Sequence, residues 1–311
     1  MNARRVIATI VFCWAGATGS MVAIADSPLF VGVLEDVEPG NLSPAMSVAH
    51  VRVAFQKRGA DWVPLKTDFA TLGALTEYYK YYPTAVNWTV VFDGKRIGTI
   101  ESKNPASPSG GGDVGTQTIT SDRAFIPKIG NGASDFSYGG GNVLPAKTRP
   151  LVLVSVPHFK DPDGWKPTAL SGAEKKAAIK NFRNRFPSLK QCDRPEEEPI
   201  HMVPYSDNEI LFIKAYRSAS GEILFGQILD NKRSNCGFFD DELFFPYWFM
   251  WDKHQQIRLL GSQMTPMDAV DLDNRSHSEW IFQTSRGEDE DGYELFYDNF
   301  AKKASFHWTY H

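Results

Sequence analysis

The spacing of the apolar runs near the C-terminus constrains the fold of this chain most. From residue 243 onward, short apolar runs are separated by polar segments. The runs are LFFPYWFMW (243–251), QIRLLG (256–261), EWIFQT (279–284), YELFYD (293–298) and SFHWTYH (305–311). Short runs rich in aromatic and β-branched residues between turn residues are typical of strands. This region therefore predicts an antiparallel meander.

Two hairpins are predicted in the preceding part of the chain. Residues 86–101 read as a hairpin because Asp93 and Gly94 tolerate the positive φ of a tight turn. Residues 209–230 read as a second hairpin around a turn at 218–221. Further strands are expected at 29–35, 47–57 and 151–156.

Helices are expected to be few, short and at the surface. Over 171–187, Ser171 and Glu174 form a capping box, and Pro187 ends the segment. A second, shorter helix is expected within 71–83. The region 102–150 is rich in Gly, Ser and Pro, which favours an extended loop and marks a place where the chain could divide into two units.

The N-terminal segment resembles a secretory signal. Arg4 and Arg5 precede an apolar run of small residues that ends in an A-x-A site at 23–25. We expect residues 1–25 to be a cleaved signal peptide and 26–311 to be one mostly β domain, secreted or periplasmic. The alternative is an uncleaved anchor, since the run is nearly long enough to span a bilayer. No second run of that length follows, so no membrane span is expected after cleavage.

Charge and cysteine content narrow the function classes. The chain carries 33 basic and 37 acidic residues, and loss of Arg4 and Arg5 takes the formal charge from −4 to −6. Nucleic-acid binding needs clustered basic residues, so no nucleic-acid partner is expected. Cys192 and Cys236 are the cysteines that remain after the signal segment, and in an exported chain we expect them to form a disulfide.

Common catalytic signatures are missing from the sequence. The chain contains no G-x-S-x-G, S-x-x-K or H-E-x-x-H motif. His307 and His311 lie on the polar side of the last predicted strand, where hydrogen-bonded rim positions are expected. Candidate catalytic carboxylates are Asp240, Asp241 and Glu242, beside the aromatic run 244–251. That run either presents rings to a sugar or forms a buried strand.

One loop carries a metal-ligand pattern. Asp271, Asp273 and Glu279 lie in DLDNRSHSE, directly before a strand. Residues 268–283 resemble the calcium-loop segment of FG-GAP-type repeats in integrin-like β-propellers, D-x-D-x-D-G-x-x-[DE]. The resemblance implies a blade-like hairpin whose acids would bind Ca²⁺. This sequence departs from the motif at two positions: Arg275 replaces the third acid, and Ser276 replaces the turn glycine.

Arg275 opens an alternative to calcium. A guanidinium near a divalent ion is strongly repelled, so a bound ion requires Arg275 to point away. We hypothesise that Arg275 replaces the ion, its fork bonding two of the three acids. A plain solvated turn is the third alternative.

These observations together favour an irregular β-propeller, with a pair of β-sandwich-like units as the alternative. The expected function is a non-catalytic binding or scaffold protein, monomeric, for an unknown protein or glycan ligand and without a cofactor unless the loop takes calcium. The alternative is a hydrolase acting on an envelope or extracellular polymer through the carboxylates near 244–251.

Overall fold

Antiparallel strands make up most of the described part of the chain. A computed structural model describes residues 28–37, 48–67, 79–105, 114–122, 150–156, 161–192, 200–230, 245–285 and 290–309. All strand pairs within these ranges are antiparallel. The expected mainly β fold is confirmed. No described helix combines the length and apolar character needed to cross a bilayer.

The N-terminal half forms a closed ring of strands, called here the ring. Its strands are β1 (Phe30–Val37), β2 (Val48–Arg58), β4 (Ala85–Phe92), β5 (Lys95–Lys103), β6 (Thr116–Ile119) and β7 (Leu151–Val154). The pairing runs β1-β7-β4-β5-β6-β2 and returns to β1. The strand β3 (Asp61–Pro64) extends the pairing at β2, and a 3-10 turn, η3 (Tyr79–Tyr81), precedes β4. The predicted strands at 29–35, 47–57 and 151–156 belong to this ring.

The second unit is an outer sheet. Its order is β14-β13-β12-β11-β8, with strands β8 (Lys166–Pro167), β11 (Ile210–Arg217), β12 (Ile223–Leu229), β13 (Tyr247–Trp251) and β14 (Ile257–Ser262). Helix α2 (Gly172–Arg185) covers one face, and Phe182 packs against Tyr247 and Phe249. A small hairpin of β9 (Leu189–Cys192) and β10 (Ile200–Val203) and the turn η6 (Asp207–Glu209) follow the helix.

The third unit is a central sheet between the other two. It is a meander of β15 (Met264–Val270), β16 (Glu279–Ser285), β17 (Glu290–Tyr297) and β18 (Lys302–Thr309). Side chains alternate between its faces: Ile281 packs into the core shared with the ring, whereas Trp280 and Phe282 pack against the outer sheet. Both faces are buried, which explains the nearly continuous apolar runs in the sequence.

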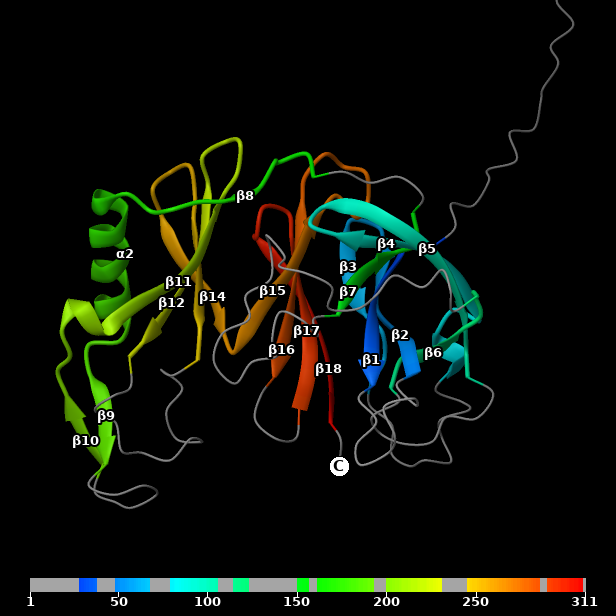
Figure 1. The fold of residues 1–311 in the computed structure, drawn as a ribbon, viewed down its shortest axis with the longest axis horizontal. Coiled ribbons are helices and arrows are strands. Elements are labelled where there is room, and N and C mark those ends of the chain that lie inside the picture. Colours follow the sequence, from blue (N-terminus) through cyan, green and yellow to red (C-terminus); the bar gives the residue numbers. More distant parts are fainter. Residues whose placement is uncertain are drawn as a thin grey trace, which may run out of the picture.

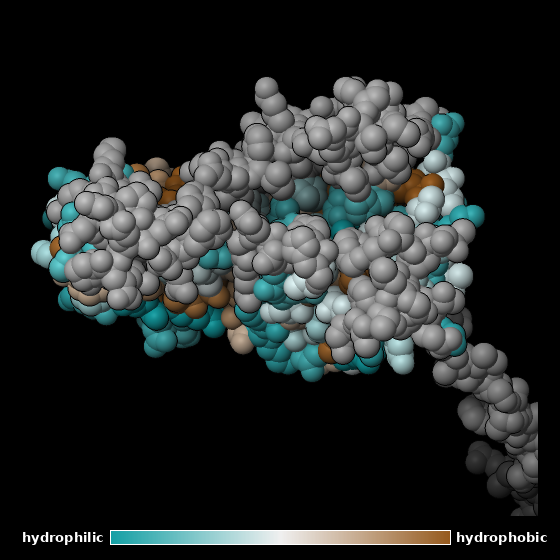
Figure 2. All heavy atoms as spheres, turned by 90° about the horizontal axis from the view of Figure 1, so that it is seen from below, coloured by the Kyte–Doolittle hydropathy of each residue, from teal (hydrophilic) through white to brown (hydrophobic). Residues whose placement is uncertain are grey.

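The units therefore stack in a row: α2, outer sheet, central sheet, ring (Figure 1). Between the outer and central sheets, the rings of Trp165, Trp280 and Phe300 meet at centroid distances of 5.4 to 6.4 Å. Burying a large apolar side chain contributes about 1.5–3 kcal/mol, so this core holds the two sheets together. Where described residues are visible from below, they are mostly hydrophilic, with hydrophobic residues in small separate patches (Figure 2).

Local sequence signals gave the turns and the helix correctly. Asp93 and Gly94 adopt φ values of 50° and 66° between β4 and β5, as the hairpin prediction required. Helix α2 begins after Ser171, and its capping box with Glu174 is present. The second predicted hairpin is β11–β12, whose turn at 218–221 is closed by a hydrogen bond from the Glu222 amide to the Ser218 hydroxyl, 3.0 Å.

One expectation needs correction, and another falls mostly outside the described residues. The meander contains β15, which was not predicted because Pro266 and Asp268 interrupt its apolar pattern. The strand tolerates both because it lies at the edge of the sheet and is irregular between these residues. A helix was expected within 71–83. Residues 68–78 fall outside the described ranges, and within 79–83 the helical residues are those of the η3 turn.

Candidate functional site

The predicted acidic loop joins β15 to β16 and brings its three carboxylates together. Asp271, Asp273 and Glu279 each place a carboxylate oxygen within 4.8 Å of the others. Backbone amides shape the loop: Asp271 accepts hydrogen bonds from the amides of Arg275 and Ser276, both at 2.9 Å, and Glu279 accepts one from Leu272 at 2.7 Å. Ser276 has a φ of 64°, so it adopts the left-handed conformation that the resemblance assigns to glycine.

The cation closest to this loop is Lys57, at the end of β2 in the ring. Its Nζ lies 2.5 Å from Asp273 Oδ2, and the two side chains are 9% and 3% exposed. The same ammonium lies 4.8 Å from the ring centroid of Trp62 and 5.7 Å from that of Tyr297. No sequence signal linked Lys57 to the loop, because the contact depends on how the ring packs against the central sheet.

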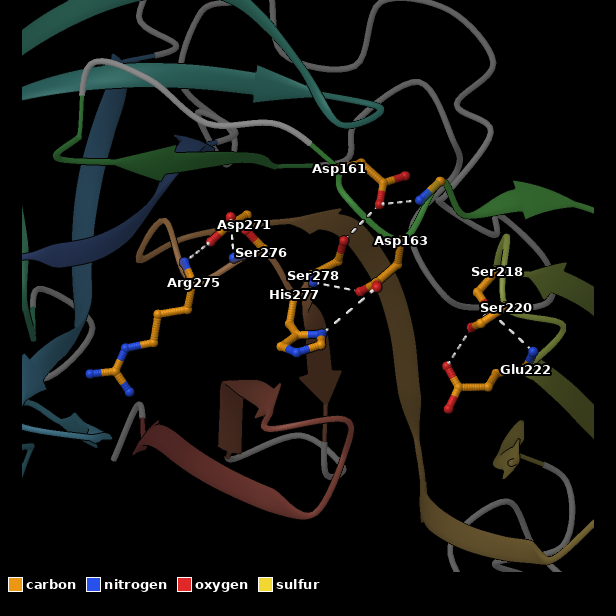
Figure 3. Close-up of polar contacts among 11 residues, drawn as sticks. Asp161, Asp163, Ser218, Ser220, Glu222, Asp271, Arg275, Ser276, His277 and Ser278 are labelled. Carbon is orange, nitrogen blue, oxygen red and sulfur yellow. Dashed lines mark hydrogen bonds and ion pairs between the residues drawn. The ribbon is translucent and has the colours of Figure 1, made fainter. Parts of the chain in front are cut away.

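Arg275 does not close the loop in the predicted way. Its guanidinium is largely exposed, with Nε 3.5 Å from Asp273 Oδ2 and Nη2 donating to the Gly59 carbonyl at 3.3 Å. It extends away from the Asp271 carboxylate (Figure 3). The prediction of a fork across two acids is therefore wrong: the side chain contacts one acid, and Asp271 binds the Arg275 backbone amide instead.

Burial, together with the nearby charges of Asp273 and Asp271, raises the pKa of Glu279 to about 8, although the Leu272 amide and Lys57 lower it. Glu279 therefore holds a proton at neutral pH. The proton and the Lys57 ammonium together offset much of the negative charge of the loop.

The donor set suits a hard divalent cation in kind, since Ca²⁺ prefers carboxylate oxygens. One buried oxygen, Asp273 Oδ1, has no hydrogen-bond partner. Lys57, however, already contacts the other oxygen of Asp273. A divalent ion about 4 Å from an ammonium is repelled by on the order of 8 kcal/mol at an effective dielectric of 20. The residues present therefore do not fit calcium while Lys57 stays in place.

Ser278 connects this loop by hydrogen bonds to the segment between β7 and β8. Its amide donates to Asp163 Oδ2 and its hydroxyl to Asp161 Oδ1, both at 2.6 Å (Figure 3). Burial raises the pKa of Asp161 above its ordinary value. His277 Nδ1 lies 3.9 Å from Asp163 and does not contact the Ser278 hydroxyl in this arrangement. The two hydrogen bonds of Ser278 join the acidic loop to the segment that carries Asp161 and Asp163, which is a structural role.

A second polar cluster lies on the face of the central sheet that is turned toward the outer sheet. It lines a cavity of about 370 Å³, which we call the Glu294 pocket. Its lining residues are Gly261, Ser262, Gln263, Met264, Thr284, Glu294 and Lys303. They come from β14, the β14–β15 connection and all four strands of the central sheet. Thr284 is 2% exposed, and its hydroxyl has no hydrogen-bond partner.

The Glu294 carboxylate is held by three neighbours on β18. It accepts a hydrogen bond from the Ser305 hydroxyl at 2.5 Å, and it lies 3.1 Å from His307 Nε2 and 3.3 Å from Lys303 Nζ. Burial raises the pKa of Glu294, but His307, Ser305 and Lys303 together hold it below its ordinary value. Glu294 is therefore ionised at neutral pH and acts as a fixed acceptor.

Gly292 allows His307 to reach this carboxylate. A Cβ at Gly292 would lie 2.3 Å from His307 Nδ1, so the imidazole lies directly over the glycine. The Nδ1 atom also lies 3.2 Å from Glu290 Oε1. The predicted hydrogen bonding of His307 is confirmed, and His311 lies outside the described residues. The pocket itself was not predicted, because its residues come from four separate segments of the C-terminal region, 261–264, 284, 294 and 303.

The remaining predicted site residues give no site in the described structure. Asp240, Asp241, Glu242 and Cys236 lie outside the described residues, so both the hydrolase carboxylates and the disulfide to Cys192 stay predictions. The aromatic run forms β13, in which every residue from Tyr247 to Trp251 is buried. The buried strand was therefore the correct alternative, and these rings do not offer a sugar platform.

Comparisons with protein-family models, with curated proteins and with solved structures gave no match. The resemblance of residues 268–283 to FG-GAP repeats thus stays a prediction based on the loop alone.

Proposed function

We propose that this chain is an exported, monomeric, non-catalytic binding protein that holds a small ligand in the Glu294 pocket. The observation that carries the proposal is the buried Thr284 hydroxyl, which lines the cavity without a partner. A buried polar group without a partner costs about 1–3 kcal/mol. A ligand that reaches Thr284 would remove this cost, so the pocket is built to be completed by a bound molecule.

The chemistry of the pocket supports binding over catalysis. A general acid needs a raised pKa, whereas the pKa of Glu294 is lowered by its neighbours. In the described part of the chain, neither the Ser262 nor the Thr284 hydroxyl bonds to a histidine or carboxylate that could activate it. Charged and hydroxyl groups are thus present for recognition, without a paired nucleophile and base.

The scaffold fits this role. Strands β11–β14 and β15–β18 form two consecutive four-stranded meanders packed face to face, the arrangement that neighbouring propeller blades have. We propose an irregular propeller-like assembly on this basis. Cleavage after residue 25, export to the periplasm or medium, and a Cys192–Cys236 disulfide belong to the same proposal.

The test combines a ligand screen with a turnover assay on the purified protein. We expect saturable stabilisation by a small ligand, weakened by Lys303→Gln and unchanged by Lys302→Gln. These adjacent lysines are a matched pair: Lys303 lines the pocket, whereas Lys302 pairs with Asp61 of the ring, 2.7 Å away. Turnover of a polysaccharide or peptide that is abolished by changing Asp240, Asp241 or Glu242 would instead establish the hydrolase alternative.

A further inference from the structure

The charge balance of the Glu294 pocket limits the class of ligand. We propose that the pocket binds a neutral, polyhydroxylated molecule of monosaccharide size; this inference rests on the proposed binding function. An anionic ligand would face Glu294 and, beyond His307, Glu290. A cationic ligand would face Lys303, which already balances the carboxylate at 3.3 Å. A neutral ligand meets neither repulsion.

The hydrogen-bonding groups of the pocket match vicinal hydroxyls. Thr284 and Ser262 each offer a hydroxyl that both donates and accepts, and Gln263 offers an amide that does the same. Glu294 adds a fixed acceptor, and Lys303 adds donors near the opening, since its side chain is 40% exposed. A sugar hydroxyl also donates and accepts at once, so it can satisfy these groups in pairs.

The size of the pocket agrees with this class. Its volume of about 370 Å³ lies at the lower end of the range for ligand sites, roughly 300–1,000 Å³. Polar lining residues come from both the outer and the central sheet, and Met264 supplies an apolar surface. The pocket therefore suits a single small ring or the end of a glycan chain.

Thr284 also provides a signature that a purely structural role would not give. Thr89 is its matched control: both are buried strand residues, 2% and 3% exposed, but the Thr89 hydroxyl donates to the Val156 carbonyl at 2.9 Å. Removing a satisfied hydroxyl destabilises a protein, whereas replacing an unsatisfied one by a methyl group stabilises it. Thr284→Val and Thr89→Val should thus shift the melting temperature in opposite directions.

The experiment measures binding of glucose, galactose and N-acetylglucosamine by saturation-transfer NMR and titration calorimetry, with glucosamine and glucuronate as charged counterparts. We expect a neutral sugar to bind saturably, and Thr284→Val to weaken its affinity about tenfold. The same substitution should raise the melting temperature of the free protein by about 2–4 °C. Thr89→Val should lower the melting temperature and leave the affinity unchanged.

Three results would overturn the inference. If a charged compound bound in a Thr284-dependent manner and neutral sugars did not, the ligand class would be wrong and the binding function would stand. If Thr284→Val lowered the melting temperature as Thr89→Val does, the hydroxyl would be satisfied by water and the pocket would not need a ligand. If no compound in a broad screen bound the protein, both the inference and the proposed function would fail.

Discussion

Tyr293 and Glu294 are adjacent residues of β17, yet their side chains enter two differently built polar clusters on opposite faces of the central sheet. Tyr293 points toward the ring, where its hydroxyl donates to Glu35 of β1. Glu294 points toward the outer sheet, where it meets Lys303, Ser305 and His307. Both clusters surround one glutamate carboxylate, but they differ in how completely their polar groups are paired.

The cluster at Glu35 is closed on all sides. Arg52 donates to both Glu35 oxygens at 2.8 and 3.0 Å, and its Nη1 donates to the Val114 carbonyl. His50 Nε2 lies 2.7 Å from the same carboxylate. Burial raises the pKa of Glu35, but the Arg52 and His50 contacts outweigh it and hold the pKa far below its ordinary value. Such a cluster joins sheets and has no group left for a ligand.

The cluster at Glu294 is open by comparison. It lies beside a cavity, and the hydroxyl of Thr284 there has no partner. A buried charge alone therefore does not indicate function: the decisive feature is a polar group whose partner is missing and a space in which that partner could sit.

Glu35→Gln should destabilise the protein more than any other single change considered. The variant leaves the Arg52 guanidinium, 5% exposed, without its counter-charge. Removing one partner of a buried ion pair costs about 3–5 kcal/mol. The free energy of unfolding, measured by urea denaturation, should fall by this amount. Tyr293→Phe should cost about 1 kcal/mol, since it removes one hydrogen bond.

The control for this change is Asp61→Asn, which removes an exposed ion pair with Lys302. Exposed pairs contribute little, so its unfolding curve should nearly overlay that of the unaltered protein. Equal losses for Glu35→Gln and Asp61→Asn would show that the Glu35 cluster does not hold the ring to the central sheet.

A third buried carboxylate, Glu279, differs from Glu35 in having no strong counter-charge. Its pKa of about 8 in the folded protein is above the value of 4.5 expected when unfolded. The folded state thus keeps a proton that the unfolded state releases, so stability falls as pH rises from about 4.5 through about 8. Glu279→Gln should remove this slope and stabilise the protein by about 2–4 kcal/mol at pH 8.5.

Urea denaturation at pH 5, 7 and 8.5 measures this effect. Glu101→Gln is the control, because Glu101 is exposed on β5. It should leave the pH profile unchanged. An unaltered slope in Glu279→Gln would mean that Glu279 is ionised in the folded protein, and the closure of the acidic loop would need a different explanation.

Much of the fold could be predicted from the sequence because its signals are local. The Asp93-Gly94 turn and the capping box of Ser171 each act within a few residues, and the alternating runs mark strands wherever they pair. Strand β15 was not predicted, because Pro266 and Asp268 are typical of loops. An edge strand nevertheless tolerates both residues. Ring closure through β1 and β2 joins segments by long-range pairing, which no local pattern specifies.

The sites were predicted only in part, for the same reason. Asp271, Asp273 and Glu279 lie within one loop, so their convergence could be read from their spacing. The cation that lies beside these acids could not be predicted from the sequence. Arg275 is near in sequence but points outward, whereas Lys57 reaches the loop from the ring. Glu294 and the unpartnered hydroxyl of Thr284 line the same cavity because of how their strands pair. That placement can be known only from the register of β16, β17 and β18.

A change beside the acidic loop tests whether Lys57 stands in for a metal ion. Lys57→Gln removes the ammonium and supplies an amide oxygen, leaving Asp273, Asp271 and Glu279 free to bind Ca²⁺. Thermal unfolding with 10 mM CaCl₂ or with chelator should be identical for the unaltered protein. The variant should gain about 1.4 kcal/mol with calcium if its dissociation constant is about 1 mM.

Two further variants make this comparison specific. Lys57→Gln combined with Asp273→Asn should lose the response to calcium, because the added change removes a ligand charge from the loop. Lys302→Gln, which removes an exposed lysine, should show no response. Stabilisation of the unaltered protein by calcium would show that Lys57 yields to the ion, and the loop would then be a metal site of the kind that its resemblance to FG-GAP repeats implies. A Lys57→Gln variant indifferent to calcium would show that the backbone amides on Asp271 and Glu279, rather than Lys57, keep the ion out.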